Sequence, residues 1–373
     1  MFATTITPTQ KHITAIDGLR AIAVMSVFLF HLRVPGFEWG SSGVQLFFVI
    51  SGFLITGILI DTIDHPHYFR HFYIRRSLRI FPIYYLTLIL LLIWGIIRGY
   101  DVVPQYLTYF FTYTQNYIQA YYKYQLGYWI MLPHTWSLAI EEQFYIIWPL
   151  LLFILRPRRL PALCLFLITT AIIWRIVTSE YSDFAIKTWI YDFALPSHID
   201  TLAVGGLITW GVRRFKRQTM LMTGVIGIMS GGAFCFLLPK LLTPTSANYW
   251  FWARNMSYYL GGTALSLFYG GCLLFAIYNV APISSLLNMR WLRYIGKISY
   301  GIYLYHMIIH VMTSNLLRPI VNLFPTDWQT TSSNVLQIII TFIVATLSWV
   351  MIEQPINRLK DHFAAYSSHK ASS

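Results

Sequence analysis

The sequence predicts an all-α fold, a polytopic bundle of about ten membrane-spanning helices. Of the 373 residues, 56% are apolar and only 11% are charged, whereas an ordinary soluble domain carries roughly 25% charged residues. The mean hydropathy of +0.55 is spread along the whole chain and is not gathered in one anchor. This composition excludes a soluble globular protein and indicates that the lipid bilayer is the main solvent of the chain.

Ten apolar segments are candidate spans, because a helix that crosses a hydrocarbon core about 30 Å thick needs about 20 mostly apolar residues. They are 16–34, 43–61, 80–98, 136–155, 161–179, 198–213, 219–238, 257–279, 294–314 and 333–352. The first follows a short polar start and lacks an Ala-x-Ala cleavage site, so we expect a retained helix and not a signal peptide. We expect a single membrane domain over residues 1–373, with no soluble domain at either end.

The positive charges predict how the bundle is oriented. The chain has 27 Lys and Arg against 14 Asp and Glu, a net charge of +13, but no basic module stands apart from the apolar segments. This excess therefore indicates topology and not nucleic-acid binding. An alternating path places 19 of these cations on one side and 7 on the other, with Arg175 inside a span. The positive-inside rule makes the richer side cytoplasmic, so both termini are expected there and residues 99–135 outside.

The outer segment 99–135 is rich in tyrosine, with nine between Tyr100 and Tyr128. One interpretation is an interfacial aromatic belt, because Tyr and Trp prefer the headgroup region. The other is a platform on which sugar rings stack. The three cysteines, in contrast, lie singly within apolar segments with no metal-ligand spacing, so we expect neither a disulfide framework nor a metal site.

The first span carries three ionisable residues, Asp17, Arg20 and His31, in IDGLRAIAVMSVFLFH. On a helix, Arg20 and His31 point within about 20° of each other and Asp17 about 40° away, which gives a polar stripe about 20 Å long. Ionisable groups inside a membrane are costly and therefore candidates for function. The alternative is a structural imidazole with an arginine that reaches the cytoplasmic interface.

A second cluster, HTWSLAIEEQFYIIWP, opens the fourth span. If the helix already runs at His134, then His134, Ser137 or Leu138, and Glu141 share one face. Glu141 and Glu142 point about 100° apart, so one of them is expected to orient an imidazole while the other braces the bundle. The alternative is a capped helix start in which Ser137 and Glu141 satisfy free amides.

A third cluster, RRSLRIFP, lies where the chain enters the third span. Arg76 and Arg79, three residues apart on a helix, present two guanidinium groups that suit phosphates. The alternative is a topological signal alone. Further polar positions are Asp200, His306 and Glu353, none of them decisive by itself.

These motifs together resemble the acyltransferase-3 family of integral membrane O-acyltransferases. The resemblance rests on IDGLRAIAV, GVQLFFVISGFLIT, RRSLRIFP, HTWSLAIEEQFYIIWPLL, SYGIYLYH and the terminal EQP, in that order, over about residues 13–358. It implies transfer of an acyl group, usually acetyl, from acyl-CoA to a carbohydrate such as O-antigen of lipopolysaccharide, exopolysaccharide or peptidoglycan, or to a macrolide. It also implies a bacterial inner membrane location and a form without the C-terminal hydrolase-like domain of larger relatives.

The residues and the resemblance together assign roles. An imidazole with a pKa near 6.5 suits proton transfer at neutral pH, so His31 is the expected base and His134 the second candidate. Glu142 or Glu141 would orient it, and Arg20, Arg76 and Arg79 would hold the phosphates of acetyl-CoA. The partners expected are acyl-CoA, a carbohydrate or lipid-linked glycan and the bilayer, with no nucleic acid and no permanently bound cofactor. The rival class is a transporter, which also carries buried charges in many spans.

Overall fold

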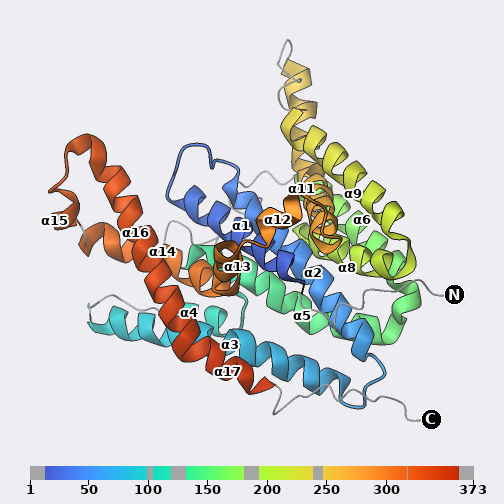
Figure 1. Ribbon diagram of the computed structural model, residues 1–373, viewed down its shortest axis with the longest axis horizontal. Coiled ribbons are helices and arrows are strands. Elements are labelled where there is room, and N and C mark those ends of the chain that lie inside the picture. Colours follow the sequence, from blue (N-terminus) through green and yellow to red (C-terminus); the bar gives the residue numbers. More distant parts are fainter. Residues whose placement is uncertain are drawn as a thin grey trace. The chain divides into compact units, whose positions relative to one another are not determined.

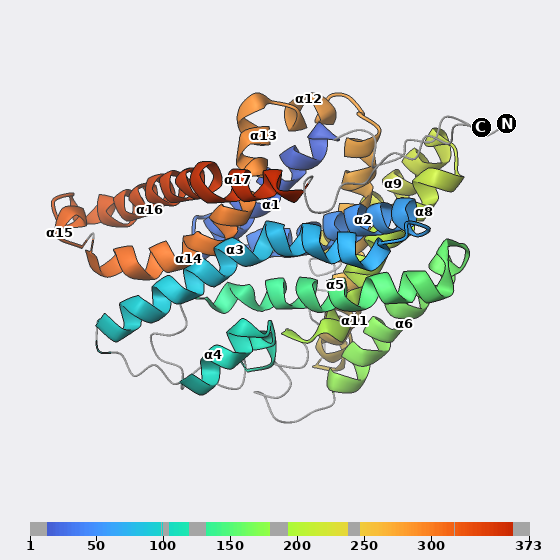
Figure 2. The same cartoon turned by 90° about the horizontal axis from the view of Figure 1, so that it is seen from below.

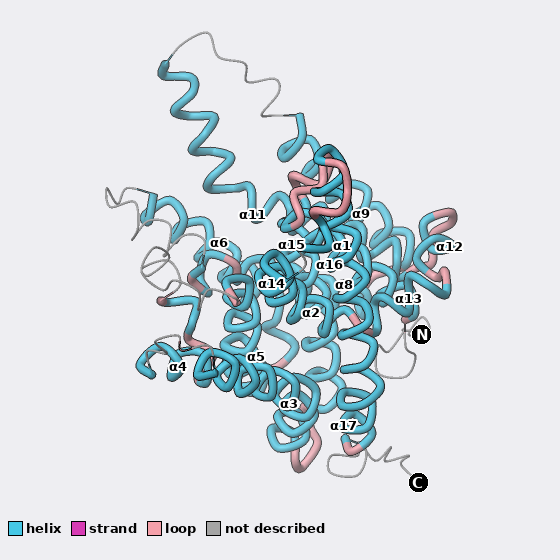
Figure 3. Tube along the Cα trace, turned by 90° about the vertical axis from the view of Figure 1, so that its left-hand side faces the viewer, coloured by secondary structure: helices cyan, strands magenta, loops and turns pink. Residues whose placement is uncertain are grey.

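The computed structural model describes residues 13–97, 99, 104–118, 132–179, 193–237, 247–316 and 318–360. Every regular element in these ranges is helical, which confirms the all-α prediction (Figures 1 and 3). Much of the tyrosine-rich segment, including residues 119–131, lies outside the described residues. Its two interpretations therefore stay predictions.

The chain forms two compact units. The first comprises residues 1–61, 113–126 and 133–299, and the second comprises 62–112, 127–132 and 300–373. Long helices of the first unit are α1 (Thr14–His31), α2 (Gly43–Thr62), α5 (Trp136–Leu155), α6 (Leu160–Ser179), α8 (Ile199–Arg214), α9 (Arg217–Gly232) and α11 (Ala247–Ile277), with the short α12 (Ile283–Leu287) and α13 (Arg290–Lys297). The second unit contains α3 (Tyr68–Ile97), α4 (Pro104–Phe111), α14 (Ser299–Leu316), α15 (Arg318–Val321), α16 (Thr326–Ser348) and α17 (Gln354–Arg358).

Eight helical stretches among the described residues are long and apolar enough to cross a membrane. They are Thr14–His31, Gly40–Thr62, Tyr68–Ile97, Pro133–Leu155, Pro157–Ser179, Arg217–Phe236, Tyr259–Ile277 and Thr326–Arg358. The two remaining predicted spans, 198–213 and 294–314, correspond to α8, with 16 residues, and α14, with 18 residues. Residues 294–297 belong instead to the separate amphipathic helix α13, which is rich in Arg and Lys.

Helix α8 lies in the interior of the first unit. Its backbone touches that of α2, because a Cβ added to Gly52 would lie 2.0 Å from the carbonyl oxygen of Leu202, and one added to Gly205 would lie 2.2 Å from that of Val49. Thr209 donates a hydrogen bond of 2.8 Å to the Phe53 carbonyl across the same contact. Most side chains of α8 are buried, so this helix faces protein more than lipid and tolerates its glycines and threonines. Beside it, α9 and α11 pack along each other (Figure 1).

In the second unit, α14 and α16 run side by side (Figure 2). Two hydrogen bonds join them, Tyr305 to Ser348 at 3.0 Å and His310 Nδ1 to Gln337 Oε1 at 2.8 Å. His306 and Glu353, the further polar positions of the sequence in this unit, are both buried. His306 Nδ1 lies 2.7 Å from the Tyr303 carbonyl oxygen of its own helix, a contact typical of a structural imidazole.

Candidate active site

The stripe on the first span lies on one continuous helix. Helix α1 runs without a break from Thr14 to His31, so the angular relation expected for Arg20 and His31 holds. Asp17 is buried with 5% of its surface exposed, whereas Arg20 and His31 are partly exposed. His31 is the last residue of the helix, and its ring lies 5.3 Å from that of Phe30 in an edge-on contact.

His134 lies in a 3-10 turn and not on the α-helix. The turn Pro133–Thr135 precedes α5, which begins at Trp136. The prediction that His134 shares a helical face with Glu141 required an α-helix at His134. It does not hold, because a 3-10 turn advances about 120° per residue and not 100°. The alternative, a helix start capped by Ser137 and Glu141, also differs from the structure. Ser137 donates to the His134 carbonyl oxygen at 3.3 Å, and the N-cap residue Thr135 makes no side-chain capping bond. His134 itself is buried, with 3% of its surface exposed.

The two adjacent glutamates have different surroundings. Glu141 is partly exposed and accepts a hydrogen bond of 3.1 Å from the Tyr145 hydroxyl. That hydroxyl lies 2.5 Å from Ser51 Oγ on α2, so Glu141 belongs to a polar chain that joins α5 to α2. Glu142 is buried, with 7% of its surface exposed. The divergence expected for neighbouring helical residues is thus accompanied by a clear difference in burial.

Three amide side chains form hydrogen bonds near the start of α5, and Gln115 binds the turn that carries His134. Gln115 donates to the Thr135 carbonyl oxygen and Asn116 donates to the Phe193 carbonyl oxygen, both at 2.9 Å. Gln143 of α5 donates to Asn116 Oδ1, also at 2.9 Å. Gln115 and Asn116 are fully buried. These residues were not predicted from the sequence, although a pair of adjacent amides near an apolar helix is a signal that could have identified them.

The arginine pair lies in the second unit. Helix α3 begins at Tyr68, twelve residues before the predicted span, so Arg76 and Arg79 are helical and lie on neighbouring positions of one face. Both side chains are partly exposed, and the Arg76 guanidinium carbon lies 6.0 Å from the centre of the Phe72 ring. The other candidates, namely Arg20, His31, His134, Glu141 and Glu142, all belong to the first unit.

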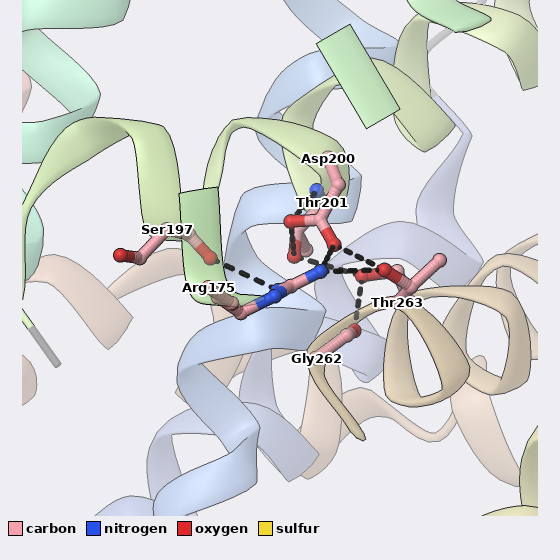
Figure 4. A network of polar contacts seen from close by, with 7 residues as sticks. Arg175, Ser197, Asp200, Thr201, Gly262 and Thr263 are labelled. Atoms are coloured by element: carbon pink, nitrogen blue, oxygen red, sulfur yellow. Dashed lines mark hydrogen bonds and ion pairs between the residues drawn. The ribbon is translucent and has the colours of Figure 1, made fainter. Parts of the chain in front are cut away.

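A buried ion pair that was not predicted from the sequence joins α6 to α8. Arg175 Nη2 lies 2.7 Å from Asp200 Oδ2, with 2% and 0% of the two side chains exposed. Thr263 of α11 completes the network, because its hydroxyl accepts from Arg175 Nη2 at 2.7 Å and donates to Asp200 Oδ2 at 2.6 Å (Figure 4). The signal was an arginine within one apolar segment and an aspartate at the start of the next, which the sequence could not pair.

The described residues contain no group of three His, Cys, Asp or Glu side chains placed to hold a metal ion. Cys164, Cys235 and Cys272 are all free, the first two of them buried. The candidate site therefore offers imidazoles, carboxylates and guanidinium groups, which are suited to proton transfer and to binding anions.

Comparison with known proteins decides the family. The model of the acyltransferase domain that defines the acyltransferase-3 family matches residues 13–353, and this range includes every candidate residue named above. The chain belongs to the acyltransferase-3 family. No solved structure matches it.

Relatives with named activities match nearly the whole chain of this acyltransferase-3 member. Peptidoglycan O-acetyltransferase OatA of Listeria monocytogenes is 29% identical over 375 residues, which cover 94% of this chain and 56% of the relative. O-acetyltransferase OatA of Staphylococcus aureus is 27% identical over 381 residues, which cover 93% of this chain and 58% of the relative. The chain thus spans somewhat more than half the length of these relatives.

Proposed function

We propose that this protein is a membrane O-acetyltransferase that moves an acetyl group from acetyl-CoA to a hydroxyl of a cell-surface glycan. The observation that carries the proposal is the family match over residues 13–353, joined to similarity with a peptidoglycan O-acetyltransferase and with a second O-acetyltransferase over more than nine-tenths of the chain. The family match identifies an acyltransferase domain, so the transporter alternative is not carried forward.

The reaction exchanges one acyl bond for another. The acceptor hydroxyl attacks the carbonyl carbon of the acetyl thioester, a C–O bond forms and the C–S bond breaks. The proton leaves the hydroxyl and ends on the sulfur of the free thiol, so a single base that takes and returns the proton is sufficient. An imidazole is suited to this because its unperturbed pKa of about 6.5 lies close to neutral pH.

His31 is the base in this proposal. Its support is its position at the end of an ordered polar stripe on α1, partly exposed and therefore accessible. His134 is the second candidate, and its deep burial makes it less accessible to a large acceptor. Glu142, the more buried of the two glutamates, is the one proposed to orient an imidazole, because the hydrogen bond to Tyr145 already gives Glu141 a bracing role.

The donor is proposed to be held by cations. Arg20, Arg76 and Arg79 carry permanent charge and planar donor geometry, which suits the phosphates of acetyl-CoA. With both termini cytoplasmic, the clustered arginines at the start of α3 face the compartment that contains this donor. The protein would then lie in the bacterial inner membrane, as a multi-pass protein with its glycan acceptor on the outer side.

The proposal is tested by two measurements on the same protein. Purified protein in lipid nanodiscs is expected to release free thiol from acetyl-CoA when a glycan acceptor is present, and not when the acceptor is absent. Mass spectrometry of surface glycans from cells with and without the protein is expected to differ by one acetyl unit on a defined sugar of peptidoglycan, exopolysaccharide or lipopolysaccharide. No acetyl difference in any glycan fraction, together with acetylation of a small hydroxylated molecule such as a macrolide, would replace the glycan assignment.

A further inference from the structure

The buried ion pair lies at the beginning of α8, where it binds residues on both sides of His198 and Ile199. Arg175 donates through Nη1 to the carbonyl oxygen of Ser197 at 3.1 Å and through Nη2 to the carboxylate of Asp200 at 2.7 Å (Figure 4). These two acceptors flank His198, which precedes α8, and Ile199, which is its first residue. One guanidinium group therefore holds the chain on either side of these two residues.

Three helices contribute side chains to the network. Asp200 Oδ2 accepts from Arg175 of α6 and from Thr263 of α11, and Asp200 Oδ1 accepts from the Thr201 backbone amide at 2.9 Å. A buried pair of charges loses its hydration, and such pairs often stabilise a protein no more than apolar residues would. Stability alone thus gives a poor reason for this arrangement. Fixing one local geometry gives a better one.

What the network fixes is the contact between α8 and the start of α5. The His198 ring lies 5.1 Å from the ring of Trp136 and 5.8 Å from that of Phe48 on α2. The short turn that contains Ser197 also packs against α5. Trp136 is the first residue of α5 and follows directly on the turn with His134. A displacement of His198 would therefore move Trp136, and with it the turn.

We infer that Arg175, Asp200 and Thr263 are positioning residues for the turn that carries His134, acting through the contact between His198 and Trp136. The inference rests on the proposed acetyl transfer for its functional consequence, in which the turn and α5 carry His134, the second candidate base, and Glu142, the residue proposed to orient the imidazole. Its structural part, the mechanical link from the ion pair to the turn, stands on the distances alone. A misplacement of about 1 Å is enough to lower the rate of an enzyme roughly 10²-fold, so a link of this kind has a measurable effect.

Two adjacent glycines of α11 provide a matched test. A Cβ added at Gly262 would lie 2.5 Å from Arg175 Nη1, the atom that donates to Ser197, so Gly262→Ala displaces the guanidinium group from this bond. A Cβ added at Gly261 would meet no atom within 4 Å. Both substitutions change the helix propensity of α11 in the same way, and only one of them perturbs the network. A second pair is Thr263→Val, which removes the bridging hydroxyl, and Thr263→Ser, which retains it.

The first readout does not depend on activity. Hydrogen–deuterium exchange of the purified protein in nanodiscs is expected to rise in Gly262→Ala and Thr263→Val for peptides that cover residues 133–140 and 193–199, and to stay unchanged in the far half of α5. Gly261→Ala and Thr263→Ser are expected to match the wild type. Increased exchange confined to α6 and α11, with the turn of His134 unaffected, would overturn the inference and leave the network as a helix clamp only.

The second readout uses turnover. Gly262→Ala is expected to lower kcat about tenfold or more while KM for acetyl-CoA changes less than about twofold, because misplacement affects the transition state and not donor binding. In a His198→Ala background, which already breaks the link, Gly262→Ala should lower kcat no further. If the losses of kcat in His198→Ala and Gly262→Ala multiply in the double variant, or if Gly261→Ala loses as much kcat as Gly262→Ala, the inference is overturned. A wild-type protein without acetyl transfer would refute the proposed function, and the exchange experiment would still decide the mechanical link.

Discussion

Replacement of His31 separates a catalytic imidazole from a structural one. His31→Gln keeps a side chain that donates and accepts hydrogen bonds but cannot carry a proton near neutral pH. His31→Ala removes both properties. Loss of a general base typically costs about 10²- to 10⁴-fold in rate, which corresponds to about 2.7–5.4 kcal/mol of activation free energy. We expect both variants to lose acetyl transfer by this factor.

We expect the same substitutions to cost little stability because His31 lies at a helix end. It is the last residue of α1 and partly exposed, and its ring makes an edge-on contact with that of Phe30 at 5.3 Å. An aromatic pair contributes about 0.5–1.5 kcal/mol, which is less than the loss expected in the barrier. The variants should therefore insert and accumulate at normal levels, and thermal stability measured by size-exclusion chromatography after heating should change little.

The assay compares acetyl transfer and abundance in the same preparations. His67→Ala, at an exposed histidine of the second unit, serves as the matched control and should keep full activity. Near-normal acetylation by His31→Gln at normal abundance would refute the catalytic role and transfer the test to His134→Gln. If both His31 variants are inactive, trapping with labelled acetyl-CoA distinguishes a base from a covalent carrier, because only a carrier retains the label.

Three further predictions concern the donor, the glutamates and the orientation. The double variant Arg76→Ala/Arg79→Ala should raise KM for acetyl-CoA and leave folding nearly unchanged. Lysine at both positions should restore KM only in part, because it lacks the planar pair of donors of a guanidinium group. An unchanged KM and full activity in the double alanine variant would leave membrane topology as the reason for the two arginines. Glu142→Gln should lower kcat more than Glu141→Gln, and the reverse order in the same kinetic assay would exchange their roles. The orientation is tested in a variant from which the three native cysteines have been removed. A single cysteine in place of Gln119, outside the described residues, should react with a membrane-impermeant reagent on intact cells, and a single cysteine in the last ten residues should not. Labelling of the C-terminal cysteine alone would show the opposite orientation.

The helices were predictable because apolar length is a strong and local signal. Each of the ten predicted segments overlaps a helix, and the errors have physical causes. Helix α3 begins earlier than predicted because hydropathy ignores a polar helical stretch such as Tyr68–Arg79. The predicted segment 294–314 falls on two helices, α13 and α14, because the charged residues from Arg290 to Lys297 form an amphipathic helix of their own. Helix α8 is short, and its polar residues are accommodated because it is covered by protein.

The candidate site was predictable only where one helix carries it. The relation between Arg20 and His31 follows from helical geometry within α1, and the structure agrees. The pairing of Arg175 with Asp200 does not follow, because periodicity gives the face of a residue but not its partner on another helix. The turn at His134 was not predicted because 3-10 turns are frequent at the ends of α-helices, and hydropathy does not distinguish them from the first turn of the helix.

Two residues of the stripe on α1, Arg20 and His31, are proposed to contribute to transfer in different ways, Arg20 to donor binding and His31 to the chemical step. If Arg20 binds phosphate of the donor, it does so equally in the ground state and in the transition state, because that part of acetyl-CoA does not change during the reaction. Arg20 and His31 are about 16 Å apart along the helix axis, too far for Arg20 to touch the atoms that react at His31. Arg20→Gln should therefore raise KM for acetyl-CoA and leave kcat nearly unchanged, whereas His31→Gln should lower kcat. Steady-state kinetics of the two variants measures this difference, and a loss of kcat without a change in KM in Arg20→Gln would mean that the arginine does not hold the donor.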